Sequence, residues 1–213
     1  MRSGGLACGV AATLLGFGVS ATAGPEFGAA PVSMPLSAAA SALARQVQAT
    51  RDHRQRPYAI VDKRQARIFV FEAGGRLAGS SPVLLGATPG DVSPPDIAQR
   101  APASLRPHER ITPAGRFESE PGHNDQGEAI VWIDYEAALA LHRLRPSPPH
   151  ERRAQRLATP TPDDNRISLG CVIVPVAFYD EIVAPLLGRR RGVVYVLSES
   201  GALPELAGAP RWD

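Results

Sequence analysis

The chain has 213 residues, of which 44% are hydrophobic and 21% charged, a composition that supports a buried core and argues against wholesale disorder. Its 23 Lys and Arg residues nearly balance 21 Asp and Glu residues, so the formal net charge of +2 gives no reason to expect nucleic acid or an anionic membrane as partner. The two cysteines are too few for a disulfide scaffold, and no Cys/His cluster has the spacing of a zinc site.

Residues 1–23 have the pattern of a secretory signal peptide. Arg2 precedes an apolar segment, residues 6–19, and small residues at Ala21 and Ala23 suit cleavage after Ala23. A buried N-terminal helix is the alternative, which the glycines of this segment disfavour. No later apolar run is long enough to span a bilayer, so we expect export to the periplasm or cell-wall compartment and no stable membrane span after cleavage.

A leader and one amphipathic helix are expected in residues 24–57. Behind Ser37, a possible N-cap, apolar residues recur at helical spacing: Leu36, Ala40, Leu43 and Val47. A single β-rich domain is expected in residues 58–199, followed by a flexible tail, residues 200–213.

The pattern changes to that of short strands after residue 57. β-Branched and aromatic runs predict strands in residues 58–62, 67–71, 83–85, 116–119, 129–133 and 193–197. The first of these, with the turns between them, predict an antiparallel meander. Residues 137–144 fit a helical turn or a strand, and Trp132 is expected to pack in the core.

One further helix and two long loops complete the predicted fold. Pro175 can open a helix with an apolar face formed by Val176, Tyr179, Ile182, Val183 and Leu186, ended by Pro185 or Gly188. Residues 87–113 and 145–162 are rich in proline, and connections of this length are usually functional or inserted. Residues 163–165 are expected to form a turn rather than a cation site. The predicted fold class is mainly β with one or two helices.

Cys171 is the one cysteine that remains after cleavage, because Cys8 lies in the predicted signal peptide. It follows Gly170, and glycine at this place lets the backbone bend and directs N–H groups toward a developing oxyanion. The thiol also needs a base, because the thiolate is the attacking form. Of the five histidines, only His142 follows an apolar run, which suits a fixed position. A buried inert cysteine and a structural histidine remain the alternative interpretation.

The order of these motifs resembles that of the YkuD-type L,D-transpeptidases of bacterial cell walls. The match runs through Val61-Asp62, residues 67–71, Gly86, Thr112-Pro113-Ala114-Gly115-Arg116-Phe117, His142 and Ser168-Leu169-Gly170-Cys171. It covers most of residues 58–198, about two thirds of the chain. The resemblance implies the catalytic-domain fold of that family, a β-sandwich or meander with long proline-rich loops.

The resemblance also implies a cysteine-dependent acyl transfer. Cys171 would attack the carbonyl of the L-to-D bond in a peptidoglycan tetrapeptide stem and expel the terminal D-alanine. His142 would take the thiol proton and later serve the incoming amine. Backbone N–H groups around Gly170 and Cys171 would hold the oxyanion, and Ser168 would steady the loop or contact substrate. The thioester would pass to the amine of a second stem, with no metal or organic cofactor.

Arginines flank the proposed pair in sequence, and one of them is expected to bind a stem carboxylate. The candidates are Arg143, Arg145 and Arg166, with Arg166 and Arg143 as the substrate-binding choices. The separation between His142 and Cys171 is longer than in compact relatives, and the proline-rich residues 145–162 account for the surplus.

Two positions depart from the family pattern. Leu169 stands where members usually carry His or another polar residue, and Ile173 stands where they usually carry Arg or Asn. Apolar residues at these places would weaken binding of an anionic stem. Two alternatives therefore stay open: a wall-binding or regulatory protein with little turnover, and an L,D-carboxypeptidase that uses water as the acceptor.

Overall fold

The structure is a computed structural model that describes residues 35–206. The predicted signal peptide, the first part of the predicted leader and residues 207–213 lie outside the described residues. Within residues 35–206, no helix has both the length and the apolar character needed to cross a membrane.

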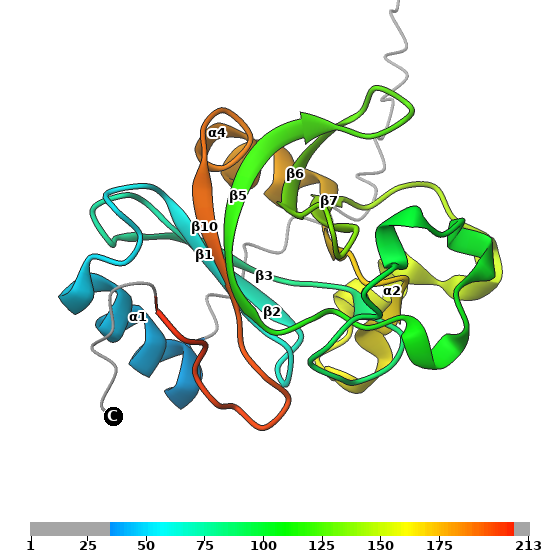
Figure 1. The fold of residues 1–213 in the computed structure, drawn as a ribbon, viewed down its shortest axis with the longest axis horizontal. Helices are drawn as coiled ribbons and strands as arrows, with labels where there is room; N and C mark the ends of the chain where they lie inside the picture. The colour runs from blue at the N-terminus through cyan, green and yellow to red at the C-terminus, as the bar shows by residue number, and fades with distance from the viewer. Residues whose placement is uncertain (1–34, 207–213) are drawn as a thin grey trace, which may run out of the picture. The chain divides into compact units, whose positions relative to one another are not determined.

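Eight strands form one mixed hydrogen-bonded sheet in the order β3-β2-β1-β10-β5-β6-β7-β9 (Figure 1). Their bounds are β1 (Tyr58–Asp62), β2 (Arg67–Phe71), β3 (Leu77–Pro82), β5 (Gly115–His123), β6 (Ala129–Asp134), β7 (Leu139–Arg143), β9 (Val172–Val174) and β10 (Gly192–Val196). Two short strands, β4 (Leu85–Gly86) and β8 (Arg166–Ser168), pair in parallel beside it. The predicted class, mainly β, is confirmed.

Strand β5 folds this sheet into two layers. Residues 115–119 pair with β10, whereas residues 120–123 pair with β6, and the strand curves visibly along its length (Figure 1). Side chains from both halves meet in one apolar core, which contains Val61, Val70 and Val194 from one layer and Val131, Leu141 and Val172 from the other. The arrangement is therefore a sandwich, as expected.

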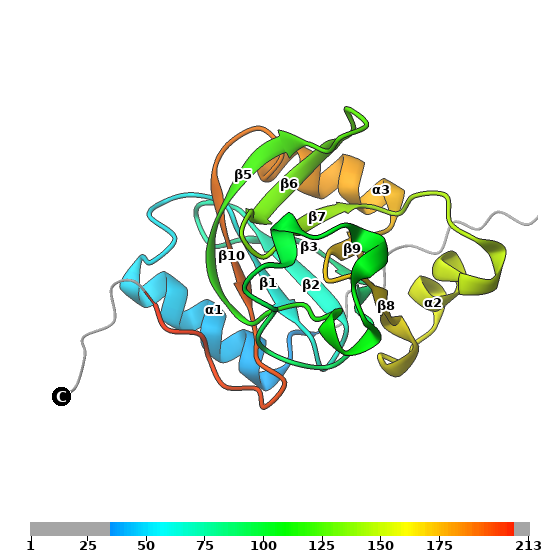
Figure 2. The ribbon, with the colours of Figure 1, turned by 45° about the vertical axis from the view of Figure 1, so that its right-hand side comes forward.

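Helix α1 (Ala38–Thr50) covers the outer face of β1, β2 and β10 (Figure 2). Its N-cap is the predicted one, since Ser37 Oγ accepts a hydrogen bond from the Ala40 N–H at 3.0 Å. The predicted apolar residues Ala40, Leu43 and Val47 are fully buried against aromatic side chains of the sheet. Leu206, in the segment expected to be flexible, packs into the same cluster.

The helix predicted after Pro175 is present and continuous. It consists of α3 (Val176–Phe178), a π-helical turn η6 (Tyr179–Val183) and α4 (Ala184–Leu186). Pro185 lies inside α4 rather than ending it, and the π-helical turn directly before it changes the hydrogen-bond spacing at the place where its missing N–H would interrupt the α-helical ladder. Val176 is 45% exposed, so the prediction that it belongs to the apolar face is wrong, whereas Tyr179 and Val183 are buried in the core.

The strand pairings include two that no local pattern indicated. β1 pairs in parallel with β10, and β7 pairs in parallel with β9. The undecided residues 137–144 contain β7. Of the predicted strand 83–85, only Leu85 belongs to β4, while Leu84 forms a single bridge with Ile173.

The two proline-rich loops contain short helices. Residues 87–113 include η1 (Ile97–Gln99), η2 (Pro102–Ser104) and η3 (Pro107–Glu109). Residues 145–162 include η4 (Pro149–Glu151) and α2 (Arg153–Ala158), and α2 was not predicted. Residues 163–165 form the turn η5 (Asp163–Asn165), as expected.

Replacement of Leu43 tests whether α1 is an integral part of the fold. Because Leu43 is fully buried between the helix and the sheet, Leu43→Ala should lower the free energy of unfolding by about 2–5 kcal/mol, measured in urea. Arg45→Ala, on the exposed face of the same helix, should change it by no more than about 0.5 kcal/mol. Equal effects of the two substitutions would contradict this packing.

Candidate active site

The loop that carries Cys171 is closed by the side chain of Ser168. Ser168 Oγ accepts a hydrogen bond from the Gly170 N–H at 3.1 Å and donates one to the Cys171 carbonyl at 2.7 Å. Gly170 has φ +146°, and a Cβ there would lie 2.9 Å from the Ile111 carbonyl oxygen, so only glycine fits. Ser168 therefore steadies the loop, and the Gly170 N–H is engaged within it.

Thr112 fastens this loop to the neighbouring chain segment. Thr112 Oγ1 donates to the Gly170 carbonyl at 2.7 Å and accepts from the Gly86 N–H at 2.8 Å. The residue is fully buried, so both backbone groups depend on this one hydroxyl rather than on water. The Thr-Pro-x-Gly motif thus contributes to the site through its first residue.

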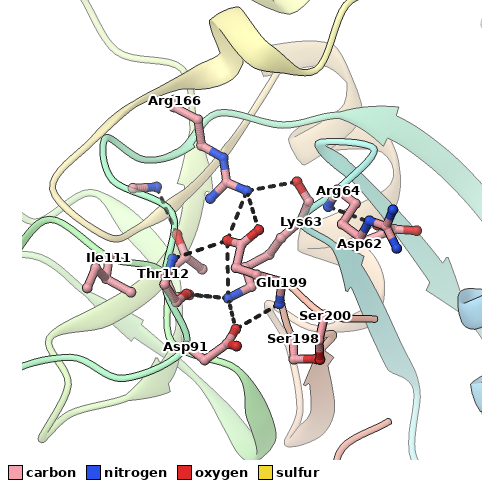
Figure 3. A network of polar contacts seen from close by, with 12 residues as sticks. Asp62, Lys63, Arg64, Asp91, Ile111, Thr112, Arg166, Ser198, Glu199 and Ser200 are labelled. Carbon is pink, nitrogen blue, oxygen red and sulfur yellow. Dashed lines mark hydrogen bonds and ion pairs between the residues drawn. The ribbon is translucent and has the colours of Figure 1, made fainter. Parts of the chain in front are cut away.

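A buried ionic network supports Thr112 from behind (Figure 3). Lys63 Nζ donates to the Thr112 carbonyl at 3.0 Å and to Asp91 Oδ1 at 2.6 Å, and Glu199 Oε1 lies 3.5 Å from it. Burial would raise the pKa of Asp91, but hydrogen bonds from Lys63 and from the Glu199 N–H hold it below its ordinary value. Arg166 closes the network through Glu199 and the Lys63 carbonyl, both at 3.0 Å.

Cys171 lies at the edge of β7, half-buried. Its Sγ is 3.7 Å from the Ala138 carbonyl oxygen, and the Ala140 N–H also points to the sulfur. Burial raises the pKa of this thiol above its ordinary value, although the Ala140 N–H and the positive charge of Arg145 partly offset that effect. The resting cysteine is therefore a thiol near neutral pH.

His142 is 7% exposed on β7 and is held in one orientation. Its Nδ1 lies 2.8 Å from the Arg143 carbonyl oxygen, which can only accept, so Nδ1 carries the proton and Nε2 keeps a lone pair. Burial lowers the pKa of the imidazole to about 4; the hydrogen bond to the Arg143 carbonyl opposes this, and the nearby charge of Arg145 adds to it. Near neutral pH this side chain is therefore a neutral base.

His142 lies on β7, and Cys171 immediately precedes β9, the strand that pairs with β7, so the two predicted catalytic residues are diagonal neighbours. His142 is paired with Ile173, two residues after Cys171. Diagonal neighbours of this kind lie about 7–8 Å apart, within reach of a long or aromatic side chain. Within residues 35–206 no hydrogen bond joins Cys171 Sγ to the His142 ring, so a proton transfer between them requires a side-chain rotation.

The two predicted substrate arginines already have partners. Arg143 lies 4.7 Å above the Tyr179 ring and pairs with Asp180 at 3.2 Å. Arg166 belongs to the ionic network described above. Sequence reasoning gave Arg145 less weight, yet its charge acts on both the thiol and the imidazole, and it pairs with Glu128 at 2.5 Å. Nothing in the sequence distinguished these arginines, because their partners come from distant segments.

The two departures from the family pattern differ in their surroundings. Leu169 is 37% exposed beside the cysteine. Ile173 is buried in a small apolar cluster with Leu84 and with Leu157 of α2, and Cys171 packs against this cluster. The proline-rich loop 145–162 thus packs on Ile173 through Leu157. In the described part of the chain, no three His, Cys, Asp or Glu side chains form a group that could bind a metal.

Comparison with known proteins finds no matching family model and no matching curated protein. Solved structures do match. The catalytic domain of an E. faecium L,D-transpeptidase is 18% identical, with a TM-score of 0.38, over 67% of this chain and 98% of that domain. An L,D-transpeptidase from Mycobacterium smegmatis is 12% identical, with a TM-score of 0.38, over 67% of this chain and 58% of that one. The helical cell shape determining protein Pgp2 from Campylobacter jejuni is 14% identical, with a TM-score of 0.42, over 72% of this chain and 50% of that one.

These matched structures include the L,D-transpeptidases that the sequence resemblance indicated. This chain spans about half the length of Pgp2. Identities below 25% with TM-scores below 0.5 identify neither an activity nor the residues that carry it, so the activity has to be inferred from the residues of this chain.

Replacing the Thr112 hydroxyl tests its role in fastening the cysteine loop. Thr112→Val keeps the shape but leaves the Gly170 carbonyl and the Gly86 N–H buried without this partner, which should cost about 1–3 kcal/mol of unfolding free energy for each group. The matched control is Thr88→Val, whose hydroxyl bonds the Pro107 carbonyl at the exposed surface and whose loss should cost about 0.5 kcal/mol or less. A Thr112→Val protein as stable as the control would contradict the role.

Proposed function

We propose that this chain is an exported cysteine acyltransferase, an L,D-transpeptidase that acts on peptidoglycan stem peptides. The observation that carries the proposal is the position of Cys171 on a tightly fastened loop. This loop leads into β9, which pairs with the strand of the buried, neutral His142. Export to the periplasm or cell-wall compartment follows from the predicted signal peptide, which lies outside the described residues.

Acylation begins from a thiol and a neutral imidazole. The His142 ring rotates toward Cys171, Nε2 takes the thiol proton, and the sulfur forms a bond with the carbonyl carbon of the L-to-D peptide bond. The Cys171 N–H is the proposed oxyanion donor, because the Gly170 N–H is engaged by Ser168 Oγ. When the carbon–nitrogen bond breaks, D-alanine leaves and takes the proton from His142.

The second half reverses these proton movements. The amine of a second stem attacks the thioester carbonyl, His142 accepts the proton that the amine loses, and the departing sulfur receives that proton as the new amide forms. Water in place of the amine gives a shortened stem and a free carboxylate, which is the L,D-carboxypeptidase alternative. Product analysis separates the two reactions, since only the first yields stem dimers.

A wall-binding protein with little turnover is the second candidate. Two observations favour it: no hydrogen bond between Cys171 and His142 is present within residues 35–206, and the exposed residue beside the cysteine is the apolar Leu169. This candidate predicts binding of stem peptides without a covalent intermediate.

Mass spectrometry can detect the proposed acyl-enzyme directly. Folded, reduced protein incubated with a carbapenem or with stem peptides should gain the mass of one acyl group on Cys171. Cys171→Ser should gain none and stay folded, because the two side chains are close in size. His142→Ala should lose acylation near neutral pH and recover part of it at alkaline pH, where thiolate forms unaided.

The matched histidine control is His150→Ala, at an exposed position in the inserted loop, which should acylate as the parent does. An unmodified Cys171 in folded parent protein would favour the wall-binding candidate. Turnover by Cys171→Ser at the parental rate would refute the assignment of the nucleophile.

The low pKa of His142 gives a distinctive pH dependence. Burial keeps the imidazole neutral, and therefore basic, down to a pH of about 4, so the acylation rate should stay level from about pH 8 to pH 5 and fall near pH 4. An ordinary histidine would cause a fall near its usual pKa of about 6.5. Circular dichroism at each pH controls for unfolding, and a fall centred near pH 6.5 in folded protein would contradict the buried-base assignment.

A further inference from the structure

Two aromatic side chains form a solvent-facing pair, one on the outer face of β6 and one just after its end. The rings of Trp132 and Tyr135 are stacked, with centroids 4.5 Å apart and an interplanar angle of 29°. Tyr135 is 53% exposed, and Trp132 is half-buried rather than packed in the core as its sequence context predicted. Its neighbours Val131 and Ile133 take the core positions, and alternation along the strand turns Trp132 to the opposite face.

The pair lines a groove of about 380 Å³, which we call the aromatic groove. Its charged lining comprises four carboxylates and one guanidinium, that of Arg116, which is ion-paired with Glu118 at 2.9 Å. The carboxylates belong to Glu118, Glu120, Asp134 and Glu136. Gly122 faces the indole: a Cβ at this residue would lie 2.4 Å from Trp132 Cδ1, so glycine permits the ring to rest against the strand backbone. The aromatic surface is therefore held in place although it faces solvent.

The strand register aligns this groove with the candidate nucleophile. Cys171 Sγ contacts Ala138, just before β7, and Ala140 on β7, and Ala140 is paired with Trp132 on β6. Trp132 is in turn paired with Glu120 on β5. Since paired residues share a face, Trp132 lies on the face that carries Ala140 and His142. Two strand spacings, about 10 Å, separate the cysteine from the indole.

The chemistry of the aromatic groove suits a neutral sugar ring. An exposed aromatic plane packs against the C–H face of a pyranose, and carboxylates accept hydrogen bonds from hydroxyl groups. Carboxylates outnumber the single guanidinium, and Arg116 is already paired with Asp52 and Glu118, so the groove disfavours an anionic ligand. In a stem peptide, three residues connect the L-to-D bond to the sugar that carries the stem, and three extended residues span about 10 Å.

We infer that the aromatic groove is a saccharide subsite, which binds the sugar at the base of the donor stem while the L-to-D carbonyl lies at Cys171. The link to the donor stem rests on the proposed function, whereas saccharide binding by the groove does not. The subsite would make the chain prefer stems attached to glycan over free stem peptides.

Intrinsic fluorescence tests the groove without any turnover. The chain has two tryptophans, so in a Trp212→Phe background Trp132 is the single reporter. Titration with a neutral N-acetylglucosamine oligosaccharide should change its emission saturably. Tyr135→Ala should weaken the apparent affinity by about 3- to 10-fold, the effect of one aromatic contact, while Tyr135→Phe should keep it.

Kinetics with matched donors then tests the link to the stem. The parent should have a higher kcat/KM for a tetrapeptide attached to its disaccharide than for the same tetrapeptide alone. Tyr135→Ala should reduce this ratio by about 3- to 10-fold and leave the value for the bare peptide unchanged.

The possible failures are distinguishable. A chain that acylates Cys171 but shows no saccharide response and equal kcat/KM for both donors would overturn the subsite and leave the proposed function standing. Saturable, Tyr135-dependent oligosaccharide binding without acylation would keep the saccharide site and refute the enzyme. Quenching by an oligolysine peptide but not by the oligosaccharide would overturn the inference in favour of a cationic ligand.

Discussion

The candidate site depends on a single buried hydroxyl. Thr112 Oγ1 connects the Gly86 N–H to the Gly170 carbonyl, and so joins the end of β4 to the loop before Cys171. A backbone carbonyl in a buried loop must find a donor, and the Thr112 hydroxyl is the donor for the Gly170 carbonyl. Lys63 donates a hydrogen bond to the Thr112 carbonyl and forms ion pairs with Asp91 and Glu199. A cluster of charged side chains therefore fixes the position of the uncharged Thr112. The cysteine loop is thus positioned by contacts that do not touch the sulfur.

The second constraint is the register of the layer formed by β6, β7 and β9. One side of this layer supplies apolar residues to the sandwich core, and period-two alternation therefore assigns the other side to His142, Ala140 and Trp132. The same alternation that buries valine and leucine gathers the polar and aromatic side chains on one face. The thiol lies at the edge of that layer, and the register places the imidazole and the indole on one face of it.

Local features of the sequence were enough to predict several elements. The limits of β1 and β2 coincide with their β-branched runs, and α1 begins where Ser37 can cap it. The parallel pairings of β1 with β10 and of β7 with β9 could not be predicted from local patterns, because each joins segments far apart in the chain. Helix α2 was missed because its one buried side chain, Leu157, gives no periodic pattern. The ion-pair partners of Arg143, Arg145 and Arg166 are set by tertiary packing, so the residues next to each arginine in the sequence do not indicate them. The core position predicted for Trp132 was wrong, although a local signal could have corrected it: Val131 and Ile133 take the core positions, so alternation places Trp132 on the opposite face.

The burial of Lys63 bears on the proposed reaction, in which an amine attacks a thioester. This residue is the only lysine in the sequence, and its ammonium group is buried and ion-paired. The remaining basic side chains are arginines and histidines, and a guanidinium stays protonated and does not attack a thioester. The side chains of residues 35–206 therefore offer no accessible ε-amine, so one copy of the protein cannot capture the acyl group of another through a lysine. Crowded molecules of this protein would not become covalently coupled to each other by that route.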